Sequence, residues 1–194
     1  MGYSNRGRSR AGVEGEKKIY SCLSNLPPEY IVYRNLLFKT RGGSTEIDIL
    51  VVSPYGLFII EVKRFAGKIV GSDADRHWVQ IARNGVIKPF YSPVLQNEGH
   101  LRVVSQILNV PFSAMAGLVC FAGNNFDLLE VNSRLVCTKY NLLERVLYFR
   151  TPIFNPQQIH YICGAIEGAN MSSAYQRRKH IKYVSKLRGR YGGF

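Results

Sequence analysis

The fold is decided by residues 45–63, which read TEIDILVVSPYGLFIIEVK. Two apolar runs rich in β-branched residues are separated by Ser-Pro-Tyr-Gly, a combination that is typical of a short turn. The segment therefore predicts two largely buried strands joined as a hairpin. We expect the rest of the chain to be arranged around this hairpin.

Charged side chains interrupt these apolar runs at Glu46, Asp48, Glu61 and Lys63. A charge inside a sheet is costly unless it is paired or bound to a metal. Side chains alternate along a strand, so Glu46 shares a face with Asp48, and Glu61 shares a face with Lys63. If the hairpin brings these faces together, Asp48 and Glu61 would offer oxygen ligands to a hard divalent cation such as Mg²⁺.

Lys63 would then lie beside the cation. Its ammonium would orient or help to deprotonate an attacking water, and it would offset charge that develops on a phosphate. Cross-strand ion pairs on a solvated sheet face are the simpler alternative. Carboxylates on one strand that face a Glu-x-Lys on the next favour the metal site over that alternative.

The composition predicts one α/β domain with an anionic partner. The chain has 194 residues, of which 46% are hydrophobic and 20% charged, as in ordinary globular proteins. The 26 basic and 13 acidic residues give a net charge of +13. An excess of this size favours nucleic acid first and an anionic membrane second.

The cysteines and the N-terminus favour a cytoplasmic protein. Cys22, Cys120, Cys137 and Cys163 are scattered without a Cys-x-x-Cys pair, so we expect reduced thiols. The N-terminus is polar and basic, which is unlike a signal peptide. No window approaches the length of a membrane span, so we expect no membrane partner.

The apolar spacing along the chain predicts helices that alternate with strands. A helix over 11–26 would carry Glu16 near its start, and Ser92-Pro93 would open a helix on which Gln96 and His100 are neighbours. Strand, helix and strand in this order predict a parallel pair. We also expect a strand at 30–39 whose side chains alternate regularly between two faces, and a third strand of the hairpin at 64–71. The remaining expected elements are strands at 115–122 and 135–138, a hairpin around Asn84-Gly85, and helices at 142–148 and 156–168.

Both ends of the chain are basic. Residues 1–10 predict a flexible arm, and residues 171–194 predict a tail that contains no acidic residue. Such a tail, with interleaved tyrosines, would grip a phosphate backbone and stack on bases, and a solvated or disordered terminus is the alternative. The candidate nucleic-acid-binding residues are Arg177, Arg178, Lys179, Lys182, Lys186, Arg188 and Arg190.

From Ala11 to Ala122 the chain resembles the nuclease-related domain (NERD) family of the PD-(D/E)XK nuclease-like superfamily. Several ordered motifs carry the resemblance: GVEGE at 12–16, EID at 46–48, GLFIIEVK at 56–63, Gly67, Trp78 and SPVLQ at 92–96. Ile47 stands where the superfamily's name has Pro. Ser92 stands where Asn usually precedes the Pro, which weakens any role for that side chain.

The resemblance implies an α/β fold with a central mixed β-sheet flanked by helices, that is, a restriction-endonuclease-like core over 11–170. It also implies a Mg²⁺-dependent site, with Mn²⁺ as a possible substitute. In that site Asp48 and Glu61 look like metal ligands, while Lys63, Glu16 and Gln96 look like catalytic residues. Glu46 and Gln80 are secondary candidates.

The sequence thus predicts a metal-dependent nuclease that hydrolyses phosphodiester bonds, with DNA preferred to RNA as the partner. A module with the same fold that binds nucleic acid without cleaving it is the alternative, because the charge excess alone would explain binding. A protein that binds a membrane surface ranks last, because the tail shows no large apolar face.

Overall fold

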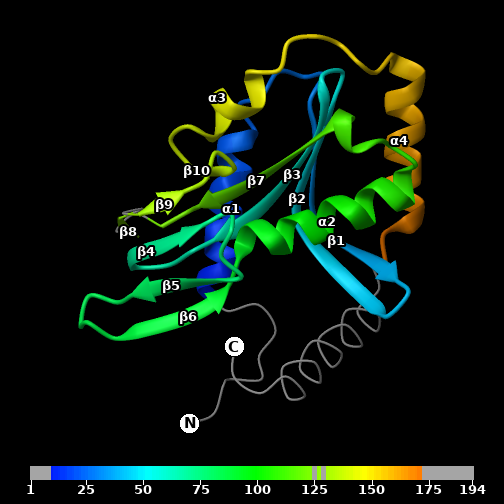
Figure 1. Cartoon of the computed structure of the whole chain (residues 1–194). Coiled ribbons are helices and arrows are strands. Elements are labelled where there is room, and N and C mark those ends of the chain that lie inside the picture. Colours follow the sequence, from blue (N-terminus) through cyan, green and yellow to red (C-terminus); the bar gives the residue numbers. More distant parts are fainter. Residues whose placement is uncertain (1–9, 124–125, 128–129, 172–194) are drawn as a thin grey trace.

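The structure, a computed structural model, describes residues 10–123, 126–127 and 130–171. Within these residues, five strands form the main sheet in the order β1-β2-β3-β7-β10. Helix α2 crosses in front of this sheet and α1 lies behind it (Figure 1). The strands are β1 (Ile31–Thr40), β2 (Gly43–Ser53), β3 (Gly56–Lys63), β7 (Met115–Phe121) and β10 (Val136–Thr138).

The predicted hairpin forms the centre of the sheet. Strands β2 and β3 pair antiparallel from Ser53 opposite Gly56 to Ile49 opposite Ile60. Gly56 has a φ of 143°, and a Cβ there would lie 3.2 Å from the carbonyl oxygen of Ala114, so the turn favours glycine. Strand β3 then pairs parallel with β7, and β7 pairs parallel with β10, which confirms the predicted mixed sheet.

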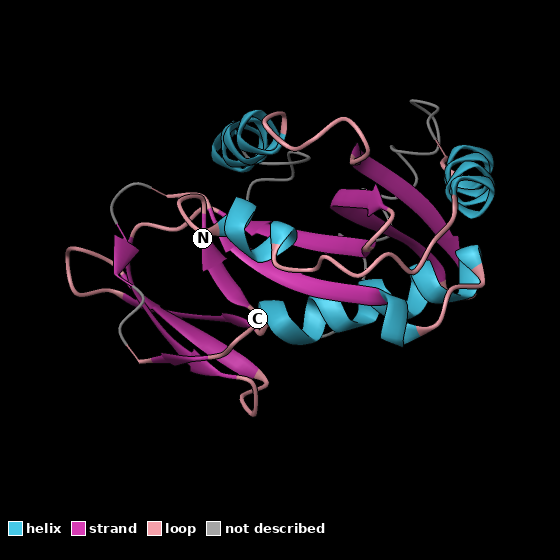
Figure 2. Cartoon of the chain, turned by 90° about the horizontal axis from the view of Figure 1, so that it is seen from above, coloured by secondary structure: helices cyan, strands magenta, loops and turns pink. Residues whose placement is uncertain are grey.

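Helices cover both faces of the main sheet, as predicted (Figure 2). Alternate residues of β2 and β3 enter two separate cores, which explains why both strands are almost continuously apolar. Ile49 and Ile60 pack on the face of α1 and α3, whereas Leu50 and Ile59 pack on the face of α2 and α4. The helices are α1 (Arg10–Leu23), α2 (Pro93–Leu108), α3 (Leu142–Leu147) and α4 (Pro156–Ala169), with a 3-10 turn at Phe112–Ala114.

A second sheet contains the strands that follow β3. Its order is β6-β5-β4-β8, and β9 also pairs with β4. Figure 2 shows it projecting from one end of the molecule. The buried Trp78 packs in one core with Ile69 of this sheet and Phe121 of the main sheet. The strands are β4 (Gly67–Ser72), β5 (His77–Ile81), β6 (Ile87–Tyr91), β8 (Phe126–Asp127) and β9 (Val131–Asn132).

The prediction that residues 64–71 add a third strand to the central hairpin is wrong, because β4 belongs to the second sheet. Gly67 has a φ of 89°, and a Cβ there would lie 2.1 Å from the carbonyl oxygen of Ile81. The chain therefore turns sharply away from β3 and packs closely against β5 at a position that favours glycine.

The regular alternation expected along 30–39 is also wrong. Val32 packs toward the core of α1, whereas Leu36 and Phe38 are buried in the core of α2. Asn35 lies between Val32 and Leu36, and its φ of 58° is a left-handed conformation. The side chains that follow Asn35 therefore point to the opposite face of the sheet from the one that regular alternation predicts. On the neighbouring strand, Arg34 is paired with Ile49 and Leu36 with Ile47, so the irregular Asn35 lies beside Asp48 of β2.

The predicted start of the helix after Ser92 is confirmed. Pro93 opens α2, and the backbone N–H of Leu95 donates to the Ser92 hydroxyl over 3.4 Å. The four cysteines carry free thiols. Within the described residues, no helix combines the length and the apolar character needed to cross a bilayer.

Candidate active site

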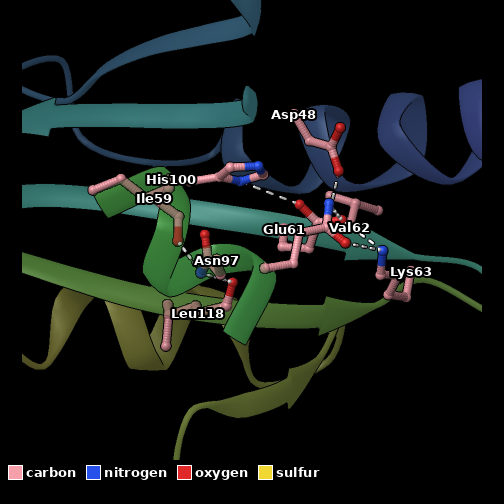
Figure 3. Close-up of polar contacts among 9 residues, drawn as sticks. Asp48, Ile59, Glu61, Val62, Lys63, Asn97, His100 and Leu118 are labelled. Carbon is pink, nitrogen blue, oxygen red and sulfur yellow. Dashed lines mark hydrogen bonds and ion pairs between the residues drawn. The ribbon is translucent and has the colours of Figure 1, made fainter. Parts of the chain in front are cut away.

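Three side chains meet where β3 ends beside the N-terminal half of α2. The Lys63 Nζ lies 2.7 Å from the Glu61 Oε1 and donates to the Gln96 Oε1 over 2.9 Å. The Gln96 Nε2 donates to the same Glu61 oxygen over 2.8 Å. A single amide therefore contacts both the carboxylate and the ammonium, and it fixes their relative positions. Figure 3 shows Glu61 and Lys63 pointing toward each other at the end of β3.

Asn97 anchors the helix that presents Gln96. Its side chain is 3% exposed, and the Nδ2 donates to the carbonyl oxygens of Ile59 and Leu118, each over 3.0 Å. One amide thereby ties α2 to both β3 and β7 (Figure 3). Gly117 permits this close approach, because a Cβ there would lie 2.8 Å from the Leu101 Cδ1. No motif or spacing in the sequence singles out Asn97.

Asp48 occupies the point on β2 where pairing with β3 stops. Its Oδ2 accepts a hydrogen bond from the backbone N–H of Val62 over 2.9 Å. Burial raises the pKa of the Asp48 carboxyl well above its ordinary value, and the charges of Glu61 and Glu16 add to the increase. The Val62 N–H and the Lys63 ammonium act in the opposite direction. Excess negative charge therefore gathers around Asp48.

Helix α1 brings Glu16 toward this region. Gly15 passes close to the end of β3, because a Cβ there would lie 3.2 Å from the Arg64 Cβ. The Arg64 Nη1 lies 2.8 Å from the Glu14 Oε2, which adds an ion pair between the same two segments. The influence of Glu16 on the pKa of Asp48 indicates that the helix-borne carboxylate belongs to this electrostatic environment.

His100 is a further buried group at the site. It is 6% exposed, and its Nδ1 lies 3.4 Å from the Glu61 Oε2. Burial lowers the pKa of the imidazole; the charge of Glu61 opposes this shift and that of Lys63 adds to it. The sequence analysis noted only that His100 neighbours Gln96, although that four-residue spacing was the signal that could have placed it here.

The profile of the nuclease-related domain, NERD, matches residues 11–122, more than half of the chain. The chain belongs to the NERD family. NERD is part of the PD-(D/E)XK-like nuclease superfamily. The mixed sheet flanked by helices is consistent with the restriction-endonuclease-like core of that superfamily.

Two further similarities span most of this NERD protein. An uncharacterised protein of Bacillus anthracis is 24% identical over 180 residues, which are 89% of this chain and 83% of the relative. A crystal structure titled as a protein of unknown function, AF1548, has a TM-score of 0.39 and 8% sequence identity. That similarity covers 91% of this chain and 97% of the other.

The structure brings together most of the residues that the NERD resemblance assigns. Glu61, Lys63 and Gln96 contact one another, and Asp48 and Glu16 interact electrostatically beside them. Glu46 lies on β2 opposite Leu37. Gln80 lies on β5 in the second sheet, and its Nε2 donates to the carbonyl oxygen of Ala66 over 2.7 Å. The roles of Glu46 and Gln80 stay predictions.

The nucleic-acid-binding residues predicted between Arg177 and Arg190 lie outside the described residues. Residues 1–9 of the predicted arm also lie outside the described residues, whereas Arg10, the last residue of that arm, is the first residue of α1. Within the described part of the chain, a separate pocket of about 810 Å³ lies on another flank of α2. It is lined by Asn97 and Leu101 but not by Asp48, Glu61 or Lys63, so we do not place the chemistry there.

The carboxylates of this NERD site fit a hard divalent cation. Burial first, and then the charges of Glu61 and Glu16, raise the pKa of Asp48, and the buried Glu61 Oε2 has no hydrogen-bond partner among the described residues. A cation would relieve that excess charge, and carboxylate oxygens are the ligands it prefers. Within the described residues, no group of three or more His, Cys, Asp or Glu side chains is arranged to hold a metal. Water or substrate would therefore complete the coordination.

Proposed function

We propose that this NERD protein is a metal-dependent nuclease that hydrolyses phosphodiester bonds of DNA. The observation that carries the proposal is the contact of one carboxylate, Glu61, with both Lys63 and Gln96, beside the half-buried Asp48. Membership of the NERD family supports a nuclease-related chemistry for this cluster.

Asp48 and Glu61 would hold the cation, Mg²⁺ or Mn²⁺. When bound, the cation supplies Lewis-acid polarisation of the phosphate and a water of lowered pKa. The Lys63 side chain is 19% exposed, so its ammonium is accessible to a phosphate and can balance the charge that develops there. Gln96 keeps Lys63 and Glu61 in their relative orientation, because it bonds to both.

DNA is the proposed substrate because the whole chain carries a net charge of +13. Basic residues that displace counterions from phosphates give affinity without sequence specificity. The predicted tail at 171–194 would supply much of this contact. The free cysteines fit the proposed cytoplasmic location, where thiols stay reduced.

Cleavage of DNA by the full chain in Mg²⁺ or Mn²⁺, compared with EDTA, tests this proposal. We expect Asp48→Ala and Lys63→Ala to abolish cation-dependent cleavage. Lys68→Ala is the matched control, because it removes an exposed lysine on β4 in the second sheet. Persistent cleavage in the Asp48→Ala or Lys63→Ala protein would contradict the assigned site.

A nucleic-acid-binding module without catalysis is the second candidate. The observation in its favour is that Glu61 is 3% exposed and that both donors on its Oε1 are protein side chains, as in a purely structural ion pair. In that case wild-type protein binds DNA without cutting it, and Asp48→Ala keeps or raises the affinity. Deleting residues 171–194 then lowers the affinity and flattens its salt dependence.

A further inference from the structure

The two oxygens of the Glu61 carboxylate have different surroundings. Lys63 and Gln96 both contact Oε1, at 2.7 Å and 2.8 Å. Oε2 faces the Nδ1 of His100 at 3.4 Å. Gln96 and His100 are one helical turn apart on α2, so a single helix face approaches both oxygens.

The atoms on the Oε2 side are both buried. Neither the Glu61 Oε2 nor the His100 Nδ1 has a hydrogen-bond partner among the described residues. Buried polar atoms are rarely left unpaired, because water cannot replace the missing partner. Since these two atoms face each other at 3.4 Å, a small approach would satisfy both.

Only one form of the imidazole is incompatible with this pairing. The neutral ring with hydrogen on Nδ1 donates to a carboxylate from that atom, and so does the cation. The neutral ring with hydrogen on Nε2 would instead present a lone pair to Glu61. The position of one hydrogen therefore decides whether His100 attracts or repels the carboxylate.

We propose that His100 is a positioning residue that carries its hydrogen on Nδ1 and donates it to one lone pair of the Glu61 Oε2, orienting this carboxylate and leaving the other lone pair of Oε2 for the divalent cation. The role of His100 toward the cation rests on the proposed function, whereas the position of the hydrogen on His100 does not. Hydrogen bonds from residues that orient a ligating carboxylate typically change metal affinity by about 10-fold to 100-fold.

Two measurements test the inference. Long-range ¹⁵N NMR on the cation-free full chain reports which nitrogen of His100 carries hydrogen, and we expect Nδ1. Mn²⁺ titration without nucleic acid then compares wild type with His100→Leu and His100→Asn. Asn offers an N–H near the position of Nδ1, whereas Leu offers none.

We expect His100→Leu to bind Mn²⁺ about 10-fold more weakly or worse, and His100→Asn to stay within about 3-fold of wild type. Val104→Ala is the control for weakened packing, because Val104 is buried on the same helix in the core against the sheet. We expect its Mn²⁺ affinity to match wild type.

Each outcome has a distinct meaning. Hydrogen on Nε2 alone overturns the inference, and so does equal Mn²⁺ affinity in wild type and His100→Leu. Loss of affinity in Val104→Ala equal to that in His100→Leu would assign the effect to packing and also overturn it. If wild type binds no Mn²⁺, the proposed metal-dependent function fails and the role toward the cation falls with it, while the NMR result still decides the hydrogen bond.

Discussion

The backbone N–H of Val62 donates to the Asp48 Oδ2 over 2.9 Å, at the point where the two central strands stop pairing. The Asp48 side chain thus accepts a hydrogen bond from a backbone N–H that lies just beyond the last regular strand pair, Ile49 with Ile60. The carboxylate is held at the edge of the hydrophobic core, where its charge is poorly solvated.

Asp48→Asn should stabilise the cation-free protein at neutral pH. The pKa of Asp48 is raised in the folded state from an ordinary value of 3.8, so its contribution to stability is full below that value and is lost as pH rises through the folded pKa. We expect the variant to be the more stable protein at pH 7, because asparagine carries no charge at this poorly solvated position.

Urea unfolding of wild type and Asp48→Asn at several pH values checks this. The advantage of the variant should shrink as pH falls toward 3.8. An Asp48→Asn protein that is less stable than wild type at pH 7 would show that the Val62 hydrogen bond outweighs the buried charge.

Mn²⁺ should raise the unfolding temperature of wild type and leave that of Asp48→Asn almost unchanged. A ligand that binds only the folded state adds about 2.7 kcal/mol of stability at 100 times its dissociation constant. Thermal unfolding with increasing Mn²⁺ measures the shift, and Ca²⁺-free buffer with EDTA gives the baseline. Equal shifts in both proteins would place the cation elsewhere.

The sequence was sufficient to predict the central sheet and most of the site. Buried strands with charges at alternate positions identified Asp48, Glu61 and Lys63 as neighbours, whereas Gln96 was assigned to the site by the resemblance to the NERD family. It did not predict the roles of Asn97 and His100, because an Asn or His on a helix is informative only once its partners are known. Asn97 binds two backbone carbonyls that lie 38 and 21 residues away in the chain.

The departures from prediction have local backbone causes. A left-handed residue at Asn35 changes the facing of β1, and a sharp turn at Gly67 sends the chain into a second sheet. Neither residue type by itself specifies such a conformation, since both also occur within regular strands. The conformations of Asn35 and Gly67 depend on contacts with distant parts of the chain, and the local sequence does not reveal those contacts.

Asn97→Leu should destabilise the fold by about 2–3 kcal/mol. The change removes two hydrogen bonds worth about 1 kcal/mol each and puts a larger apolar group between α2 and the sheet. Urea unfolding measures the loss. Glu98→Leu is the control, because the adjacent Glu98 is exposed and its ion pair with Arg102 is at the surface. Equal losses in both variants would contradict the anchoring role.

Gly71→Ala should displace Trp78, the only tryptophan of the chain. A Cβ at residue 71 would lie 2.3 Å from the Trp78 Cγ, which is too close for any side chain. We expect a red-shifted tryptophan emission and a loss of about 1–3 kcal/mol in unfolding. Gly164→Ala on α4 is the control, because a Cβ at residue 164 would meet nothing within 4 Å. We expect this substitution to stabilise the helix. Unchanged emission in Gly71→Ala would contradict the packing.

Gln96→Met should separate the proposed role of Gln96 in positioning Lys63 and Glu61 from its packing. Methionine has a similar volume and flexibility but neither donates to Glu61 nor accepts from Lys63 as the amide does. Because Lys63 and Glu61 would still attract each other, we expect the fold to survive and cleavage to fall about 10-fold to 100-fold through a lower kcat. Steady-state cleavage assays with parallel unfolding curves measure both effects. A variant that keeps full kcat would show that the ion pair of Lys63 and Glu61 orients itself without the amide.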